Sequence, residues 1–106
     1  MNFEQARRRQ HPRVPAGFLV KLHSGGKQIV RKARDLSLTG VLVEGDGAEL
    51  DDRIVVEIPL PNEQRVVVVT GKVVRDLESG TSGVHFLDLD WDDMFALARF
   101  LAPRLP

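Results

Sequence analysis

The chain has 106 residues, of which 42% are hydrophobic and 28% are charged, so it is long enough for one folded domain with a modest core. It contains no cysteine, which excludes disulfides, thiolate metal sites and a cysteine nucleophile. No apolar run approaches the length of a membrane span and no signal peptide opens the chain, so we expect a cytoplasmic protein without membrane insertion.

The net charge is zero, but the charges are distributed unevenly along the chain. Residues 1–34 contain nine Lys or Arg and one acid, a balance of +8, whereas residues 35–106 contain six basic and fourteen acidic residues, a balance of −8. A neutral chain argues against the broad positive surface that binds long nucleic acid. The basic first third permits a local site for a small polyanion. The alternative is that opposite charges simply interleave in the fold.

The beginning of the chain has no strand pattern. Residues 7–9 are three consecutive arginines, a like-charge run that resists burial. Pro12 and Pro15 then hold the residues before them in extended backbone. We therefore expect a flexible, arginine-rich arm over residues 1–12 and a single β-barrel domain over residues 13–106.

The middle of the chain has the alternation of β-strands. Apolar residues recur at every second position, as in Phe18, Val20 and Leu22, which indicates strands with one buried face. The Gly25-Gly26 pair favours a hairpin turn between the first two strands. The expected strands cover residues 18–23, 28–34, 41–44, 53–60, 65–75 and 83–87.

The segment 65–75 interrupts this alternation with four consecutive valines and Gly71. Two explanations stay open: a strand that is buried on both faces, or a β-bulge at Gly71. Either way, the pattern predicts six or seven short antiparallel strands and no second domain.

The period changes to that of a helix near the C-terminus. Asp90 is a suitable N-cap, and Asp92 and Asp93 suit the positive end of the helix dipole. Pro103 ends the helix. The expected core-facing side of the helix, which would cover an end or side of the barrel, contains Trp91, Met94, Phe95, Ala98, Leu101 and Ala102 and is widened by Leu97 and Phe100. The fold class is therefore all-β, a barrel with a C-terminal α-helix.

Two short motifs carry the candidate chemistry. The first is Arg9-x-x-x-Arg13, preceded by Arg8, and the second is the hexapeptide 35–40, in which Asp35, Ser37 and Gly40 are spaced as Asp-x-Ser-x-x-Gly. The bland alternative for the hexapeptide is an ordinary loop between strands. These six residues are the candidate ligand-binding residues of the chain.

The side chains of the two motifs are chemically complementary. Arginine binds phosphate through a planar fork, stacks on flat rings and pairs with the O6/N7 edge of guanine. An Asp carboxylate can accept two bonds from the N–H groups on the other edge of guanine, while Ser adds a donor and an acceptor. Gly40 leaves room for a ligand or a backbone to approach closely. Together these groups suit a compact, anionic guanine nucleotide better than a sugar or a lipid.

With these two motifs the sequence resembles the PilZ domain family, bacterial receptors for cyclic di-GMP (c-di-GMP). The resemblance rests on both motifs in order, on the Pro-then-strand opening and on the late strand Gly83-Val84-His85-Phe86, and it extends over residues 7–102. It implies a six-stranded antiparallel barrel with a C-terminal helix, no enzymatic activity and no cofactor.

The resemblance also implies roles for individual residues. Arg8, Arg9 and Arg13 would wrap over the nucleotide and contact its phosphates and guanine bases, whereas Asp35, Ser37 and Gly40 would form the floor against one guanine. Val73 or Val74 would stand where some members support a base with a bulky side chain.

Three functions remain open. The first is a receptor in which c-di-GMP orders the arm and changes the surface presented to an unidentified effector protein. The second is a nucleotide-independent adaptor for motility or pilus machinery. The third, a barrel that binds RNA, is weakened by the scarcity of aromatic residues for base stacking. We expect no metal site, since His23 and His85 are far apart in sequence and have no third ligand at a suitable spacing, and no catalytic residues.

Overall fold

The computed structural model describes residues 12–75 and 80–105; Arg8, Arg9 and the rest of the predicted arm up to residue 11 lie outside these ranges. The elements in chain order are β1 (Val14–Pro15), β2 (Leu19–Ser24), β3 (Lys27–Leu36), β4 (Gly40–Glu44), the 3-10 turn η1 (Gly47–Glu49), β5 (Arg53–Leu60), β6 (Arg65–Val74), β7 (Thr81–Asp88), the helix α2 (Trp91–Leu101) and the 3-10 turn η2 (Ala102–Arg104).

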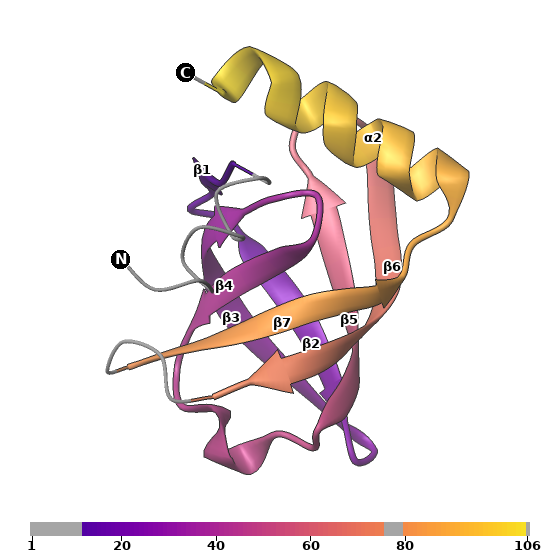
Figure 1. Cartoon of the computed structure of the whole chain (residues 1–106). Coiled ribbons are helices and arrows are strands. Elements are labelled where there is room, and N and C mark those ends of the chain that lie inside the picture. Colours follow the sequence, from indigo (N-terminus) through magenta and orange to yellow (C-terminus); the bar gives the residue numbers. More distant parts are fainter. Residues whose placement is uncertain (1–11, 76–79, 106) are drawn as a thin grey trace, which may run out of the picture.

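Six antiparallel strands close into a barrel (Figure 1). Their order is β3-β2-β5-β6-β7-β4, and β4 pairs back with β3, which completes the ring. Closure leaves the backbone groups of the barrel wall paired with neighbours instead of exposing a long edge. α2 crosses one end of the barrel, so the predicted six-stranded antiparallel barrel with a C-terminal helix is confirmed. The sequence pattern missed β1, a two-residue strand that pairs with the last two residues of β3.

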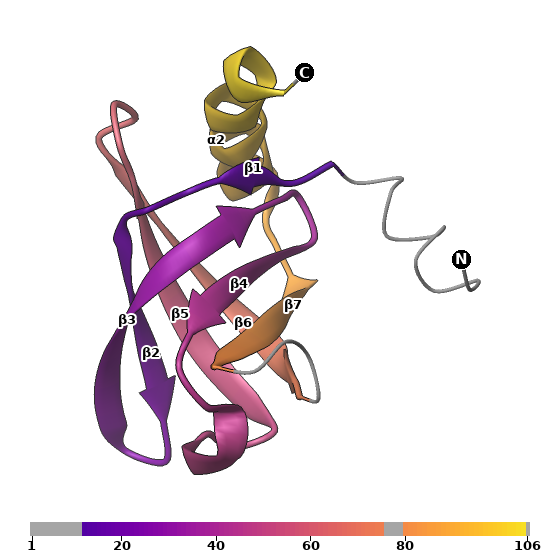
Figure 2. The ribbon, with the colours of Figure 1, turned by 90° about the vertical axis from the view of Figure 1, so that its left-hand side faces the viewer.

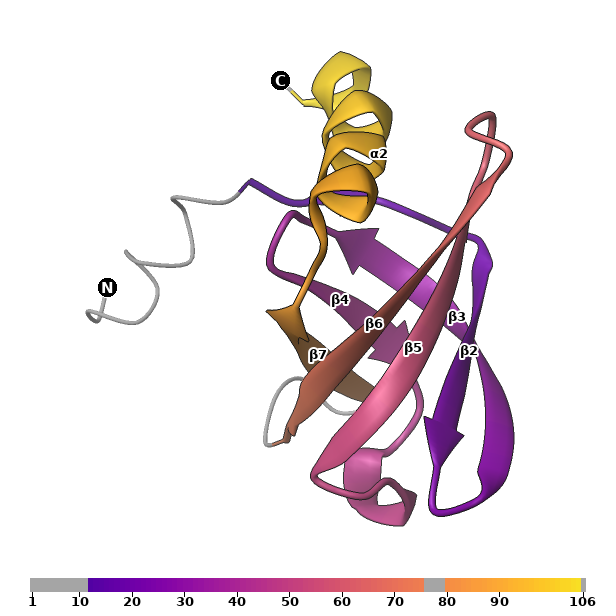
Figure 3. The same cartoon turned by 90° about the vertical axis from the view of Figure 1, so that its right-hand side faces the viewer.

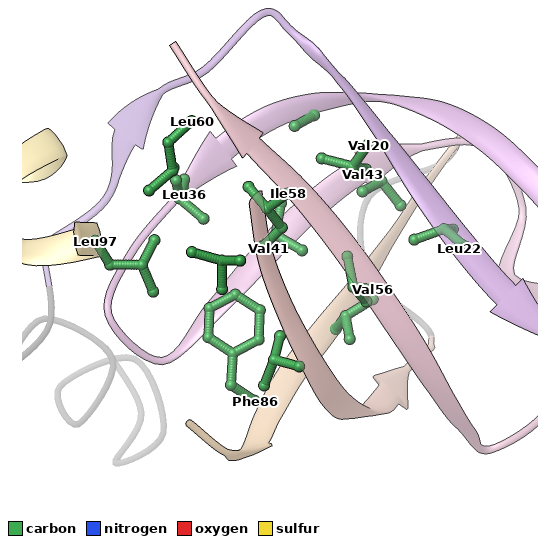
Figure 4. Packing of buried hydrophobic residues seen from close by; sticks show 14 of the residues in the cluster. Val20, Leu22, Leu36, Val41, Val43, Val56, Ile58, Leu60, Phe86 and Leu97 are labelled. Atoms are coloured by element: carbon green, nitrogen blue, oxygen red, sulfur yellow. The ribbon is translucent and has the colours of Figure 1, made fainter. Parts of the chain in front are cut away.

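The barrel interior is filled by the alternate apolar residues of the strands (Figure 4). On β2, Val20 and Leu22 point inward and Leu19 and Lys21 are exposed, as the alternation predicted. The same holds on β5, where the even-numbered positions of 54–60 are all buried. Figure 4 also shows Leu97 of α2 pointing from the helix toward this interior, so the helix closes the core at that end.

The four consecutive valines of β6 do not mark a strand buried on both faces. Val67 and Val69 are buried, whereas Val66 and Val68 are about half exposed, so this explanation was wrong. The register between β6 and β7 shifts beside Gly71, but the extra residue is Leu87 of β7, because Thr70 pairs with Asp88 and Gly71 with Phe86. β6 itself alternates without interruption.

α2 packs through part of the face that the sequence predicted: Leu97, Phe100 and Leu101 are buried, but the side with Trp91, Met94 and Phe95 is not. The side chains of Trp91, Met94 and Phe95 are 71%, 37% and 53% exposed. The residues that the helix buries are Asp93, Ala96, Leu97, Phe100 and Leu101. Apolar residues occur on most of the circumference of this helix, so its hydrophobicity alone does not select the buried face.

Ion pairs to the β5–β6 hairpin fix the orientation of α2. Figure 3 shows the hairpin rising beside the helix. Arg65 at the start of β6 contacts the carboxylate of Asp93 at 2.8 Å, and Arg99 donates to Glu63 at 3.1 Å. The hydrogen bond to Asp93 raises the pKa of Arg65 above its ordinary value, so this guanidinium stays charged at every physiological pH. Asp93 must therefore face the barrel, which turns Trp91 outward.

Candidate functional site

Four of the six predicted site residues meet in one open pocket on the outside of the barrel, and the other two, Arg8 and Arg9, lie outside the described residues. The pocket has a volume of about 150 Å³. It lies where β3, β4 and β7 run side by side (Figure 2). Its lining consists of Arg13, Asp35, Ser37, Thr39, Gly40, Val41, Leu42, Val74, Gly83, Val84 and His85.

A β-bulge directs Asp35 to the pocket. β3 continues to Leu36, so Asp35 lies in a strand and not in the loop that the sequence predicted. Ala33 and Leu36 are both buried although they are three positions apart, because the register with β4 shifts between Ala33 and Asp35. In a regular strand Asp35 would share the inward face of Ala33. The extra residue at the bulge reverses this parity and places Asp35 on the outer face.

β1 places Arg13 beside Asp35. Val14 is buried in the core and pairs with Leu36, while Pro15 pairs with Asp35. Arg13, the next residue toward the N-terminus, therefore emerges at the rim of the pocket. Its Nη1 atom lies 3.9 Å from Oδ1 of Asp35, and the two side chains are 50% and 26% exposed. This is a loose and only partly exposed ion pair, so the two groups can rearrange around a ligand.

The loop between β3 and β4 is held by the hydroxyl of Ser37. Its Oγ accepts from the backbone N–H of Thr39 at 3.1 Å and donates to the carbonyl of Gly40 at 3.4 Å. The backbone N–H of Ser37 also donates to the carbonyl of Gly40, at 2.9 Å. Short polar side chains commonly close turns in this way. Ser37 is 3% exposed, so its first role is to shape the loop.

Gly40 allows β4 and β7 to approach closely at the pocket. It pairs with His85, and a Cβ atom at this position would lie 2.6 Å from the carbonyl oxygen of Val84. No real side chain fits at this distance. The sequence predicted that Gly40 admits a close approach, and the structure shows that the approaching group is the backbone of β7.

The floor of the pocket is a row of residues across four strands. Asp35 pairs with Leu42, Leu42 with Gly83, and Gly83 with Val74. All four lie on the outer face, and Gly83 leaves the space between two apolar side chains open. Of the two valines that the sequence left open, Val73 is buried in the core, so only Val74 can contact a ligand in this pocket.

His85 is an ionisable pocket residue that the sequence reasoning did not assign to this site. On β7 it alternates with the buried Val84 and Phe86, which places it on the same outer face as Gly83. The sequence contained a signal for this position. Residues 83–87 were predicted as a strand, and the alternation of a strand places Gly83 and His85 on the same face. The assignment also required knowing that β7 lies beside β4.

The pocket therefore combines a guanidinium, a carboxylate, a polar loop and an apolar floor. A flat ring with N–H groups on one edge can lie on Leu42 and Val74 while Asp35 accepts its hydrogen bonds. Arg13 can contact an anionic group or stack on the same ring. This arrangement can bind a nucleotide but contains no paired acid and base for catalysis among the described lining residues.

The comparisons with known proteins agree with this fold and place the whole barrel in one family. The family model of the PilZ domain matches residues 7–102. No curated protein gives a significant match to the chain. No helix within residues 12–75 and 80–105 is long and apolar enough to cross a membrane.

Several solved structures are similar to this chain. The Bacillus subtilis inhibitor of motility (MotI/DgrA) has a TM-score of 0.75 and 23% sequence identity, over 92% of this chain and 50% of that one, so this chain spans half of that protein. The PilZ domain of YcgR from Escherichia coli, solved with c-di-GMP, has a TM-score of 0.69 and 18% identity, over 92% and 91%. The PilZ domain of CeSA from a cellulose synthesizing bacterium has a TM-score of 0.66 and 18% identity, over 87% and 96%.

Sequence identities this low show a common fold, whereas the family match over residues 7–102 shows membership. PilZ domains are non-catalytic, which is also what the sequence predicted for this chain. The chain belongs to the PilZ domain family.

Proposed function

We propose that this domain is a receptor for c-di-GMP. The observation that carries the proposal is the pocket that brings together Arg13 from the first motif and Asp35, Ser37 and Gly40 from the second. These residues come from segments more than twenty positions apart in sequence, and they meet on one face of the barrel. Membership of the PilZ family and the similarity to the YcgR domain that holds c-di-GMP support the same ligand.

In the proposed complex one guanine lies on the apolar floor of the pocket. Asp35 accepts hydrogen bonds from the N–H groups of the base, and Val74 supports its face. Arg13, together with Arg8 and Arg9, contacts the phosphates or stacks on the exposed base. A pocket of about 150 Å³ is smaller than the roughly 300–1,000 Å³ of typical small-molecule sites. Much of the ligand therefore projects from the barrel, and residues 1–12 act as the arm that covers it.

Binding would be coupled to a signal through this arm. Contacts between the arginines and the ligand fix residues 1–12 against the barrel, which changes the surface available to an effector protein. The barrel, residues 13–106, is the rigid surface against which the arm holds the ligand. The output is therefore a protein contact and not a chemical reaction.

Isothermal titration calorimetry with c-di-GMP tests this proposal. The wild-type protein is expected to bind, and Arg13→Ala and Asp35→Ala are each expected to weaken binding by about tenfold or more, the usual effect of losing a hydrogen bond to a charged group. Arg99→Ala is the matched control, because it removes an arginine that pairs with Glu63 between β5 and β6 and does not line the pocket. Cyclic di-AMP is expected to bind poorly, since it lacks the N–H pattern that Asp35 reads. Absence of heat with c-di-GMP, or equal binding by all variants, would overturn the proposal.

A nucleotide-independent adaptor is the second candidate, and one observation favours it. Trp91 and Phe95 are largely exposed on α2, and their ring centroids are 5.9 Å apart. Exposed aromatic residues are enriched in protein interfaces. The similar B. subtilis protein is named an inhibitor of motility, which makes motility proteins the first partners to test. Capture of the same partner with and without c-di-GMP favours the adaptor, whereas capture only with nucleotide favours the receptor.

A further inference from the structure

His85 occupies a position in the pocket that neither signature motif accounts for. It lies on the outer face of β7 and its side chain lines the pocket. Its partner on β4 is Gly40, which has no side chain. Residues paired across antiparallel strands have Cα atoms about 4.5–5.5 Å apart. The imidazole therefore borders directly on the space above Gly40, at the opposite rim of the pocket from Arg13.

A second cationic residue stands next to His85. Lys72 on β6 pairs with His85 on its other side, so Gly40, His85 and Lys72 form one row across three strands. This row lies parallel to the floor row that begins at Asp35. Arg13 and His85 thus both line the pocket, and Lys72 lies next to His85 outside this lining.

The charged groups around His85 come from several elements. On its own strand, Asp88 lies further along, opposite Thr70. The neighbouring strand β6 contributes Lys72, and the far side of the pocket contributes Arg13 and Asp35. The outer face of β4 carries Gly40, Leu42 and Glu44, of which Glu44 lies furthest from His85, opposite Thr81. A positive charge on His85 would therefore add to the positive charge of its neighbour Lys72.

c-di-GMP carries two phosphodiester groups on opposite sides of its ring, and Arg13, just before β1, and His85, on β7, reach the pocket from different elements. We propose that His85 is a ligand-binding residue that contacts the second phosphodiester, and that its protonation makes ligand binding depend on pH. The inference rests on the proposed function. Histidine normally changes its charge between about pH 5 and 8. Phosphodiesters stay ionised throughout this range, and carboxylates ordinarily titrate well below it.

The sign of the dependence follows from the charges. Protonated His85 is attracted to the phosphodiester and donates a charge-assisted hydrogen bond to it, so binding is stronger at the lower pH. Lys72, next to His85, adds an attraction that does not depend on the protonation of His85. One such contact at a partly exposed site is expected to change the Kd about threefold to tenfold between pH 8.0 and pH 5.5.

Calorimetric titration with c-di-GMP at pH 5.5 and pH 8.0 tests the inference. The wild-type protein is expected to bind more tightly at pH 5.5. His85→Gln keeps a polar side chain but cannot be charged, so its two Kd values are expected to be equal within about twofold, both near the wild-type value at pH 8.0. His85→Lys carries a permanent charge and is expected to bind tightly at both values.

Two control variants separate His85 from the other histidines of the chain. His23→Gln alters the histidine that contacts Glu57 on the β2–β5 face, and it is expected to retain the pH effect. His11→Gln alters the histidine between Arg9 and Arg13 in the sequence, and it is also expected to retain the effect. A pH effect that persists in His85→Gln, or that disappears in His11→Gln, overturns the inference.

The inference and the proposed function fail in different ways. A pH-independent Kd with normal c-di-GMP binding overturns the role of His85 and leaves the receptor intact. Absence of c-di-GMP binding at both pH values overturns both.

Discussion

Gly40 and Val84 are in such close contact that a Cβ atom at residue 40 would lie 2.6 Å from the Val84 carbonyl oxygen. Gly40→Ala is therefore expected to force β4 away from β7. Overpacking of this kind typically costs about 1–3 kcal/mol. Urea denaturation monitored by circular dichroism measures the loss. The affinity for c-di-GMP is expected to fall with it, because the displaced strand carries Leu42 and closes the loop at Ser37.

A second glycine provides the comparison. Gly80 has φ +80°, and a Cβ atom at this residue would meet no other atom within 4 Å, so Gly80→Ala introduces backbone strain without a clash. Its expected cost is about 1 kcal/mol, with no change in c-di-GMP affinity. Equal losses of stability in the two variants, with binding retained in both, would show that the close approach at Gly40 is not a constraint.

The alternation of apolar and polar residues predicted most of the barrel, because the apolar positions of such a strand are the buried ones. Residues 18–23 and 53–60 alternate cleanly, and their inward positions form the core. The pattern failed at Asp35, which it assigned to a loop. Continuing the alternation from Ala33 would have turned Asp35 into the core, so a loop was the natural inference. The bulge arises from pairing with β4, a long-range contact that a local pattern does not contain.

The site was predicted in part for a similar reason. Arg13, Asp35 and Gly40 were found through motif spacing, and the structure places them in one pocket. His85 and Val74 were not assigned uniquely, because their place in the pocket depends on the order of strands β4, β7 and β6. Strand order is set by the closure of the whole barrel.

The two faces of α2 should differ sharply in their contribution to stability. Leu97 is completely buried, so Leu97→Ala leaves a cavity and is expected to cost about 2–5 kcal/mol. Trp91 is 71% exposed, and Trp91→Ala is expected to cost about 0.5 kcal/mol or less. Urea denaturation followed by circular dichroism compares the two. As a check in the wild-type protein, the fluorescence of Trp91, the only tryptophan, should be quenched readily by iodide. A protected Trp91, or a large loss in Trp91→Ala, would contradict this orientation of the helix.

The Arg65 and Asp93 pair is expected to matter more for stability than the Arg99 and Glu63 pair. Arg65→Ala leaves the carboxylate of Asp93, which is 6% exposed, without its guanidinium partner, whereas Arg99→Ala alters a more exposed contact. Thermal unfolding should therefore show a larger decrease in Tm for Arg65→Ala. The double variant Arg65→Ala/Asp93→Ala should recover part of the loss, because no buried charge is then left alone. Equal Tm values for the two arginine variants would show that the Arg65–Asp93 pair does not stabilise the protein more than the Arg99–Glu63 pair.

The contribution of Arg65 to the thermal stability of the protein should not depend on pH in the neutral range. The hydrogen bond to Asp93 raises the pKa of this guanidinium in the folded protein. A group with a raised folded pKa contributes its full stabilisation below its ordinary pKa and loses it only as the pH rises through the folded value. The ordinary pKa of an arginine side chain already lies far above the neutral range, so the difference in Tm between the wild type and Arg65→Ala is expected to be the same at pH 6 and pH 9. A difference that shrinks at pH 9 would require another titrating partner.

Ser37 should act on the ligand through the loop that it holds. Ser37→Ala removes the acceptor for the N–H of Thr39 and the donor to Gly40, and the loss is expected to cost about 1 kcal/mol, as for one or two buried hydrogen bonds. Because the loop borders the pocket, the affinity for c-di-GMP should fall as well. Thr39→Val is the matched control: it removes only the contact between the Thr39 hydroxyl and Ser37, at 3.2 Å, and should cost less on both measures. Calorimetry and urea denaturation on the same samples compare the two losses. Full stability with lost affinity in Ser37→Ala would contradict this role and would make the hydroxyl a direct ligand contact.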